Sequence, residues 1–310
     1  MKRNSFLKAL GAGTIGLTGM QNMIAKPLVE NSILQKKAYS FNLNYAPHLG
    51  MFSSIVGDNP IAQLHFIADQ GFTAFEDNEM RNRPIKLQNE MASVIKERGL
   101  KMGVFVAHTI YWRKPNLASG DKTLRNKFLN EIKASIPVAK RVGAKWMTVV
   151  PGHIDPTQNM AYQTSHVVQS LREAANILEK EELCMVLEPL NFRDHPGLFL
   201  SESPQAYEIC KAVNSDACKI LFDIYHQQVQ EGNLIPNINK CWSEIAYFQI
   251  GDNPGRNEPS TGEINYLNVF KHIHSKGYKG ILGMEHGNSK PNQEGALAVI
   301  DAYKTIDNLL

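Results

Sequence analysis

The sequence is poor in cysteine, and its four cysteines form no CxxC pair. They are Cys184, Cys210, Cys218 and Cys241 in a chain of 310 residues. This spacing excludes the usual zinc-binding patterns and gives no disulfide framework. We expect the thiols to be small buried hydrophobic groups, with one disulfide as the alternative in an oxidising compartment.

The sequence also lacks an excess of one charge and a long apolar run. Its 33 Lys and Arg and 30 Asp and Glu residues give a net charge of +3, and the basic residues are scattered, so a nucleic-acid partner is not expected. The uncharged stretch 9–20 is too short to span a bilayer. No GxGxxG motif follows the first strand candidate, which argues against a dinucleotide domain and an organic cofactor.

The N-terminal segment has the order of an export signal. A basic start precedes the short apolar stretch, and "RNSFLK" is similar to a twin-arginine signal with Asn4 in place of the second arginine. We therefore expect residues 1–38 to be an export signal and linker of a periplasmic protein that has no stable membrane insertion after processing. The alternative is an amphipathic N-terminal helix that packs on the folded domain.

From about residue 40 onward, short apolar runs alternate with longer amphipathic ones. The strand candidates are 40–46, 73–77, 101–108, 145–152, 184–191, 219–226, 245–252 and 280–287. The helix candidates include 84–99, 122–143, 166–182, 203–213, 265–277 and 294–310, and Ser203 is the expected N-cap of one of them. Short apolar runs are typical of parallel strands buried on both faces. The strict alternation predicts a single α/β domain over 39–310, a (β/α)8 TIM barrel.

Polar residues end four successive strands of this predicted barrel. They are Glu188, Asp223 with His226, Gln249 and Glu285. The C-terminal ends of barrel strands meet at one rim, so their oxygen atoms should converge. Three carboxylates there would repel one another, and an all-oxygen set suits Mg²⁺ or Mn²⁺. Each residue alone has another explanation, such as a helix cap, an ion pair or, for His226, simple packing.

Two of these carboxylates suggest a reaction. Glu188 and Glu285 come from different sides of the rim and can flank a substrate. A metal that binds a carbonyl and an adjacent hydroxyl makes the C–H bond between them acidic, and two carboxylates can then remove and return the proton. This chemistry is an aldose–ketose isomerisation or an epimerisation beside a ketone.

Four motifs resemble the hydroxypyruvate isomerase family of the xylose isomerase-like TIM barrels. They are "EPLN", "FDIYHQQ", "FQIGDNPGRNEPSTGEINY" and "MEHG", and the similarity runs from about residue 40 to the C-terminus. The resemblance implies that Glu188 and Glu285 are the proton donor and acceptor. It also implies that these two, Asp223 and Gln249 bind the metal. Gln249 stands where ketose 3-epimerases usually have histidine, which favours the isomerase branch.

The substrate implied by the resemblance is hydroxypyruvate, converted to tartronate semialdehyde, or a similar short keto sugar acid. His226 is expected to contact substrate oxygens. Arg256 suits a substrate carboxylate, and its alternative partner is Glu258 in the same loop. Glu258 itself and His108 complete the predicted substrate contacts.

Two departures leave the substrate more open than the chemistry. Asn257 replaces the histidine of the usual PGRHEP motif, and export is unusual for an enzyme of glyoxylate metabolism. The alternatives are a ketose 3-epimerase of the tagatose or psicose type and an exported, non-catalytic sugar-binding protein on the same barrel. A nuclease of the endonuclease IV type needs more histidines and a basic surface. Association into a homo-oligomer is left open.

Overall fold

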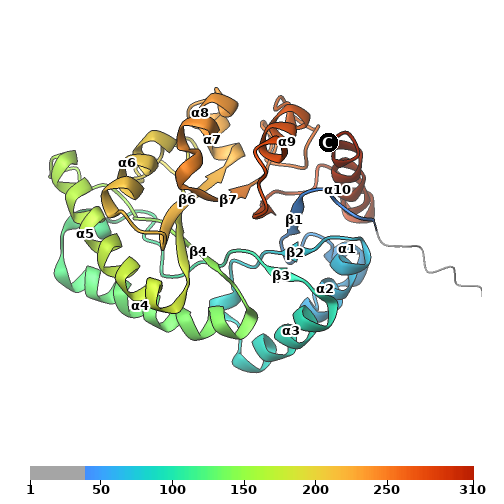
Figure 1. The fold of residues 1–310 in the computed structure, drawn as a ribbon, viewed down its shortest axis with the longest axis horizontal. Helices are drawn as coiled ribbons and strands as arrows, with labels where there is room; N and C mark the ends of the chain where they lie inside the picture. Colours follow the sequence, from blue (N-terminus) through green and yellow to red (C-terminus); the bar gives the residue numbers. More distant parts are fainter. Residues whose placement is uncertain (1–38) are drawn as a thin grey trace, which may run out of the picture. The chain divides into compact units, whose positions relative to one another are not determined.

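The strands of the barrel lie side by side as a ring, with the helices outside it, as Figure 1 shows for a computed structural model of the protein. The structure describes residues 39–310. The predicted export signal and linker, residues 1–38, lie outside the described residues.

Eight strands overlap the eight predicted strand segments. They are β1 (Asn44–Pro47), β2 (Ala74–Phe75), β3 (Lys101–Met102), β4 (Trp146–Val149), β5 (Cys184–Leu187), β6 (Cys218–Asp223), β7 (Ile245–Gln249) and β8 (Ile281–Met284). Six of them form one parallel sheet in the order β1-β8-β7-β6-β5-β4, and β2 pairs with β3. Parallel bridges from His48 to Glu76 and from Val106 to Thr148 join the two sheets on both sides. The prediction of a TIM barrel is confirmed.

Ten α-helices accompany the strands in the described part of the chain. They are α1 (Ser53–Val56), α2 (Pro60–Asp69), α3 (Ile85–Arg98), α4 (Lys122–Val142), α5 (Met160–Leu178), α6 (Ser203–Val213), α7 (Ile224–Gln230), α8 (Leu234–Cys241), α9 (Tyr266–Ser275) and α10 (Asn292–Asp307). Short 3₁₀ helices cover Met80–Asn82, Leu117–Ser119, Glu179–Glu181 and Trp242–Glu244. Helices α3 and α4 end at Gly99 and Gly143, whose φ angles of 65° and 67° are left-handed and suit glycine.

One local prediction was wrong, because Ser203 does not cap α6 from outside. Ser203 is the first helical residue, and Glu202 occupies the cap position without a side-chain hydrogen bond. The free amide of Ser203 donates instead to the carboxylate of Glu231, which follows α7. A distant acid therefore satisfies the backbone group that a local cap would have satisfied.

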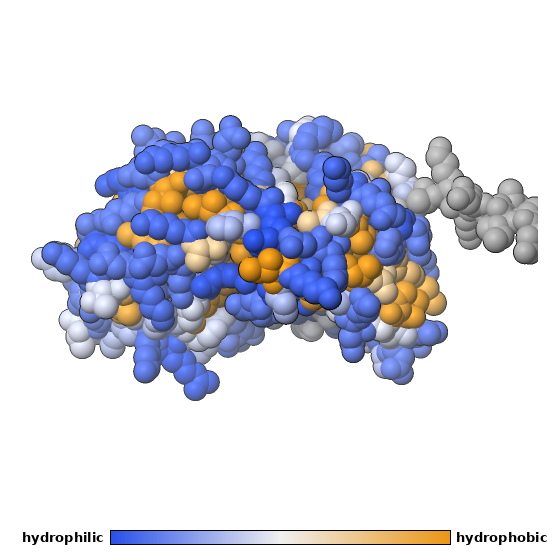
Figure 2. Space-filling model, turned by 90° about the horizontal axis from the view of Figure 1, so that it is seen from below, coloured by the Kyte–Doolittle hydropathy of each residue, from blue (hydrophilic) through white to orange (hydrophobic). Residues whose placement is uncertain are grey.

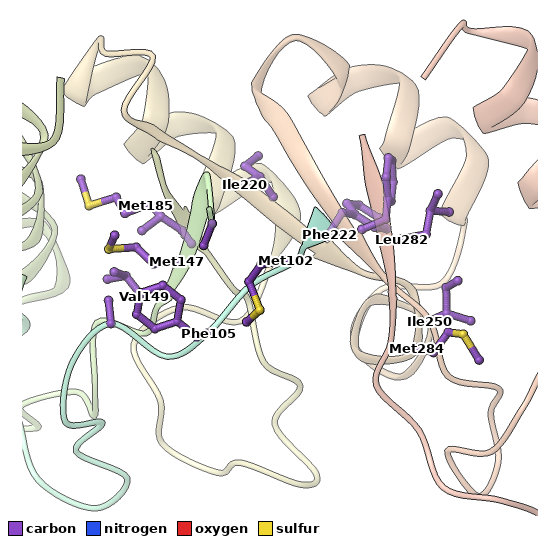
Figure 3. Close-up of a cluster of buried hydrophobic side chains, with 14 of the residues drawn as sticks. Met102, Phe105, Met147, Val149, Met185, Ile220, Phe222, Ile250, Leu282 and Met284 are labelled. Carbon is purple, nitrogen blue, oxygen red and sulfur yellow. The ribbon is translucent and has the colours of Figure 1, made fainter. Parts of the chain in front are cut away.

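Two apolar layers fill the barrel, because successive residues of a strand point to opposite sides. One layer packs between the strands and the helices, and Figure 3 shows members of this layer such as Met147, Phe222 and Leu282. A smaller cluster lies on the other face of the strands and includes Ala74, Val186 and other residues of the barrel interior. Because side chains alternate along a strand, the interior cluster shows which residues at the strand ends point toward the barrel axis.

The surface and the cysteines of the described residues show no unusual feature. Figure 2 shows one face of the molecule, on which hydrophobic side chains form separate patches among hydrophilic ones. Within residues 39–310 no helix combines the length and the apolar character needed to cross a membrane. All four cysteines are buried and free, which agrees with their expected role as small hydrophobic groups.

Candidate active site

The predicted rim residues continue the interior face of the barrel by one step. Glu188, Asp223 and Gln249 each stand two positions after an interior residue of the same segment, and Glu285 stands four positions after the interior residue Ile281, so all four point to the same side. Strand pairing places Asp223 in register with Gln249, and Gln249 in register with Gly283. The structure thus brings the four side chains to one end of β5–β8, which are neighbours in the sheet.

Glu188, Asp223 and His226 form the most compact group. One oxygen or nitrogen of each lies within 4.8 Å of the others, and all three residues are buried. Burial, followed by the charges of Glu285 and Asp223, raises the pKa of Glu188 well above its usual value. Burial also raises the pKa of Asp223, against the opposing charge of Arg256. Such crowded carboxylates fit a hard divalent cation such as Mg²⁺ or Mn²⁺, which would offset their repulsion.

The hydrogen bonds of His226 decide what its ring can do. The backbone N–H of Asn191 donates to Nδ1 at 3.3 Å, so Nδ1 is an acceptor. Burial and the charge of Arg256 lower the pKa of His226 to about 3, so the ring is neutral and carries its proton on Nε2. This Nε2 is buried and has no hydrogen-bond partner among the described residues. In this tautomer it can donate a hydrogen bond beside the carboxylates.

Arg256 joins two of the predicted metal ligands. Its Nη2 donates to Asp223 at 2.9 Å and to Glu285 at 2.6 Å. Glu285 also accepts a hydrogen bond from the side chain of Asn78 at 2.8 Å, so both of its oxygens are held. The alternative partner of Arg256 was Glu258, but Glu258 accepts from the backbone and hydroxyl of Ser289. Glu258 therefore links two rim loops, and among the described residues Arg256 forms its ion pairs with Asp223 and Glu285 instead.

A buried aspartate shapes the loop that carries Arg256. Asp252 accepts hydrogen bonds from the backbone amides of Thr261, Gly262 and Ile264 at 2.9–3.1 Å. The loop therefore folds around one carboxylate, and Arg256 adopts a left-handed φ of 49° within it. The polar and glycine-rich composition of the loop 252–264 is thus explained partly by the turn around Asp252, and not only by the position of Arg256.

A pocket of about 490 Å³ opens beside this group. Glu285 and Arg256 line it, together with Asn78, Arg83 and His48 from the loops after β1 and β2. Two of the site residues predicted from the sequence, Glu285 and Arg256, therefore lie at the wall of this pocket. Asn78 and Arg83 were not predicted from the sequence, because the predicted metal ligands all follow the fifth to eighth strands.

The loop after the third strand approaches the site from the other side. The ring of Trp112 stacks on His195 at a centroid distance of 5.1 Å, and His195 lies 5.4 Å from His226. His108, from the same loop, does not line the pocket of about 490 Å³. It is buried against Phe128, and its Nε2 accepts from the backbone N–H of Val150 at 3.3 Å. Its predicted role in substrate binding stays a prediction.

The burial of His108 predicts a loss of stability in acid. Burial lowers the pKa of His108 to about 4, below its value in the unfolded chain. The contribution of neutral His108 to the free energy of unfolding is thus complete above about pH 6.5 and is lost as the pH falls toward about 4. Between pH 7 and pH 5, wild type should lose about 2 kcal/mol more unfolding free energy than His108→Gln. Urea titrations of both proteins at the two pH values measure this difference, and equal losses would contradict it.

Glu76 is a further buried acid that the sequence analysis missed. It follows β2, two positions after the interior residue Ala74, and its Oε1 accepts a hydrogen bond from Nε2 of Gln249 at 3.3 Å. Burial and the charge of Glu285 raise its pKa well above the usual value. A Cβ on Gly283 would lie 1.9 Å from its Oε1. The sequence "TAFED" contains the pattern that would have identified it, because Glu76 stands two positions after Ala74 and therefore points to the same side of the strand.

The space beside Glu76 predicts the effect of filling it. Gly283→Ala should lower the unfolding free energy by about 1–3 kcal/mol, because the new methyl group meets the Glu76 carboxylate. Removing the carboxylate in a Gly283→Ala, Glu76→Ala double variant should recover part of this loss. Chemical denaturation of wild type, Gly283→Ala, Glu76→Ala and the double variant tests the coupling, and additive losses would show that the methyl group acts elsewhere.

Residues 64–306 match the family described as the xylose isomerase-like TIM barrel. The chain belongs to this family. Hydroxypyruvate isomerase of Escherichia coli is 35% identical over 178 residues, which cover 57% of this chain and 69% of that protein. A 2-oxo-tetronate isomerase of Cupriavidus necator is 29% identical over 203 residues, or 64% of this chain and 76% of that protein. The resemblance to the hydroxypyruvate isomerase family is confirmed, and the protein is an enzyme of the isomerase type.

Solved structures share the fold of this family member. A protein of Brucella melitensis described as an AP endonuclease of family 2 has a TM-score of 0.73 and 23% identity, and the match covers 82% of this chain and 96% of that one. A 3-keto-D-glucoside 4-epimerase of Escherichia coli has a TM-score of 0.70 and 18% identity, with coverage of 86% and 99%. At these identities the matches support the barrel and not a particular reaction.

Proposed function

We propose that the protein is a metal-dependent isomerase of hydroxypyruvate or a closely similar short keto sugar acid. The observation that carries this proposal is the convergence of Glu188, Asp223 and Glu285 with Arg256 at one end of the barrel, beside a pocket. The names of the isomerase relatives support the substrate class.

The residues suited to hold the metal are Glu188, Asp223, Gln249 and Glu285. The buried Oε1 of Gln249 has no hydrogen-bond partner among the described residues, so it is free to bind a cation. A bound Mg²⁺ or Mn²⁺ would polarise the carbonyl and hydroxyl oxygens of the substrate and make the C–H bond between them acidic.

The proton transfer uses two carboxylates from different strands. One of Glu188 and Glu285 takes a proton from the hydroxymethyl carbon of hydroxypyruvate, and the electron pair passes to the carbonyl to give an enediolate. The other glutamate gives a proton to the former carbonyl carbon, and the hydroxyl proton moves between the two oxygens, which yields tartronate semialdehyde.

Two further groups orient the substrate. The Nε2–H of His226 lies beside the carboxylates and can donate to a substrate oxygen. Arg256 presents a guanidinium that can bind a carboxylate, although binding requires it to share or leave its contacts with Asp223 and Glu285.

The size of the pocket favours testing larger substrates as well. A volume of about 490 Å³ is well above the size of a three-carbon acid. Purified protein with Mg²⁺ should therefore be followed by NMR on hydroxypyruvate, a four-carbon 2-oxo acid, fructose and psicose. Turnover of the acids alone supports the isomerase. Turnover of the free ketoses alone would make it a ketose 3-epimerase, and binding without any turnover would indicate a sugar-binding protein.

We also propose export to the periplasm through residues 1–38, on the basis of the signal-like sequence order described above. Fusion of this segment to a reporter that folds in the cytoplasm tests it, together with a variant in which Lys2 and Arg3 are replaced by Gln. Export of the first fusion and retention of the second are expected. Retention of both would contradict the proposal.

A further inference from the structure

Glu76 reaches across the inside of the barrel to a residue on a distant strand. It follows β2, whereas its partner Gln249 ends β7, and the two residues are 173 positions apart in the chain. Both side chains are almost completely buried, with exposed fractions of 1% each. A carboxylate is rarely buried at this depth without a specific partner.

Two glycines leave the room that this acid occupies. A Cβ on Gly283 would lie 1.9 Å from Oε1 of Glu76, and a Cβ on Gly103 would lie 2.3 Å from the Tyr247 hydroxyl and 3.0 Å from Cγ of Glu76. These glycines come from β8 and from the residue after β3. The barrel interior is therefore shaped around the Glu76 side chain from two sides.

The contact fixes which end of the Gln249 amide faces the carboxylate cluster. A side-chain amide has a donor end and an acceptor end, and Glu76 offers an acceptor oxygen in either protonation state. The nitrogen of Gln249 is therefore held toward Glu76 at 3.3 Å, and Oε1 is left without a partner among residues 39–310. Without this contact, rotation of the amide by a half-turn would present two N–H groups in place of the oxygen.

We propose that Glu76 is a positioning residue for the metal site: by accepting from Nε2 of Gln249, it holds Oε1 of Gln249 ready to bind the cation. This inference rests on the proposed metal-dependent function. It assigns a role to an acid that is not one of the four proposed metal ligands. Outer partners that orient a ligand commonly change metal affinity by about 10–100-fold when they are removed.

A purely structural role for Glu76 makes a different prediction. If the acid only fills the space beside the two glycines, its replacement changes stability but not the affinity of the folded protein for a cation. If it acts through Gln249, the loss of affinity disappears once Gln249 has been removed.

The test is Mn²⁺ titration by calorimetry on the whole protein and four variants. Glu76→Met removes the acceptor at similar volume and should weaken Mn²⁺ binding by about 10–100-fold. Glu76→Gln keeps one acceptor oxygen and should lose less than Glu76→Met. If Glu76→Met does not fold, Glu76→Asp replaces it in the test. This variant shortens the side chain by one methylene and should weaken Mn²⁺ binding by about tenfold. The control is Glu244→Met. Glu244 is also buried, but it precedes β7, at the other end of the barrel, and pairs with Lys219. The Glu244→Met variant should bind Mn²⁺ like wild type.

The same titration in a Gln249→Ala background completes the test. Adding Glu76→Met to Gln249→Ala should cause no further loss of affinity. The proposal is overturned if the Glu76 variants bind Mn²⁺ within twofold of wild type, or if Glu76→Met weakens binding equally with and without Gln249. Failure of the wild type itself to bind Mn²⁺ would overturn the metal site, and this assignment with it.

Discussion

Glu285→Gln should lower the turnover number on the keto-acid substrate by about a thousandfold, within the range of a lost general acid or base. The amide keeps the shape of the side chain but cannot accept a proton from carbon. It also lowers the negative charge available to a cation at the rim. Glu285 is held by Asn78 and Arg256, so the variant side chain should stay close to its wild-type position.

The measurement for Glu285→Gln is a steady-state assay with Mn²⁺ in excess, combined with thermal unfolding. The melting temperature should change by only a few degrees, because the Glu285 side chain is 24% exposed and near the surface of the pocket. Glu294→Gln is the matched control: this acid pairs with Lys290 at the start of α10 and should keep activity within twofold. Full activity of Glu285→Gln would remove Glu285 from the reaction.

Glu188→Met should abolish activity and at the same time stabilise the protein in the presence of a chelator. Glu188 is buried beside other carboxylates, and its raised pKa shows that the fold disfavours its charged form. An apolar side chain of similar volume removes this cost, with a gain on the order of 2 kcal/mol.

The sign of the pH dependence follows from the raised pKa. For an acid whose pKa is higher in the folded than in the unfolded protein, stability is complete below the unfolded value near 4.3 and falls as the pH rises. The advantage of Glu188→Met in chelator should therefore be larger at pH 8 than at pH 5.

Addition of Mn²⁺ should reverse the order of stability. Wild type gains stability from a cation that binds only the folded state, whereas Glu188→Met has lost a ligand. Thermal unfolding of both proteins with chelator and with Mn²⁺ shows whether the curves exchange their order. A variant that is less stable under both conditions would indicate that Glu188 supports the fold and not a cation.

Much of the barrel could be predicted because its signals are local. Apolar runs of strand length, amphipathic helices and glycines such as Gly99 report the structure of their own segment. The rim residues could also be found, since Glu188 and Asp223 end strongly apolar strands. Their convergence followed from the rule that parallel strands end at one rim.

The rest depended on contacts between segments far apart in the sequence. Glu76 and Asn78 follow a strand of only two residues, and their roles come from partners on β7 and β8. Helix α7 was not predicted because it starts directly at the end of β6, where Asp223 caps it by accepting from the amide of His226. The bond of Glu258 to Ser289 likewise joins two loops that the sequence does not show to be neighbours.

Exchange of deuterium from D₂O into hydroxypyruvate and the four-carbon 2-oxo acid tests the central claim most directly. It reports proton transfer at carbon even where no net product forms. The account predicts that the wild-type protein catalyses exchange at the carbon beside the carbonyl with Mn²⁺ or Mg²⁺ but not with chelator, and that Glu285→Gln and Glu188→Met do not catalyse it. Equal exchange with and without metal, or exchange at the wild-type rate by both variants, would contradict a carboxylate pair acting with a divalent cation at this rim.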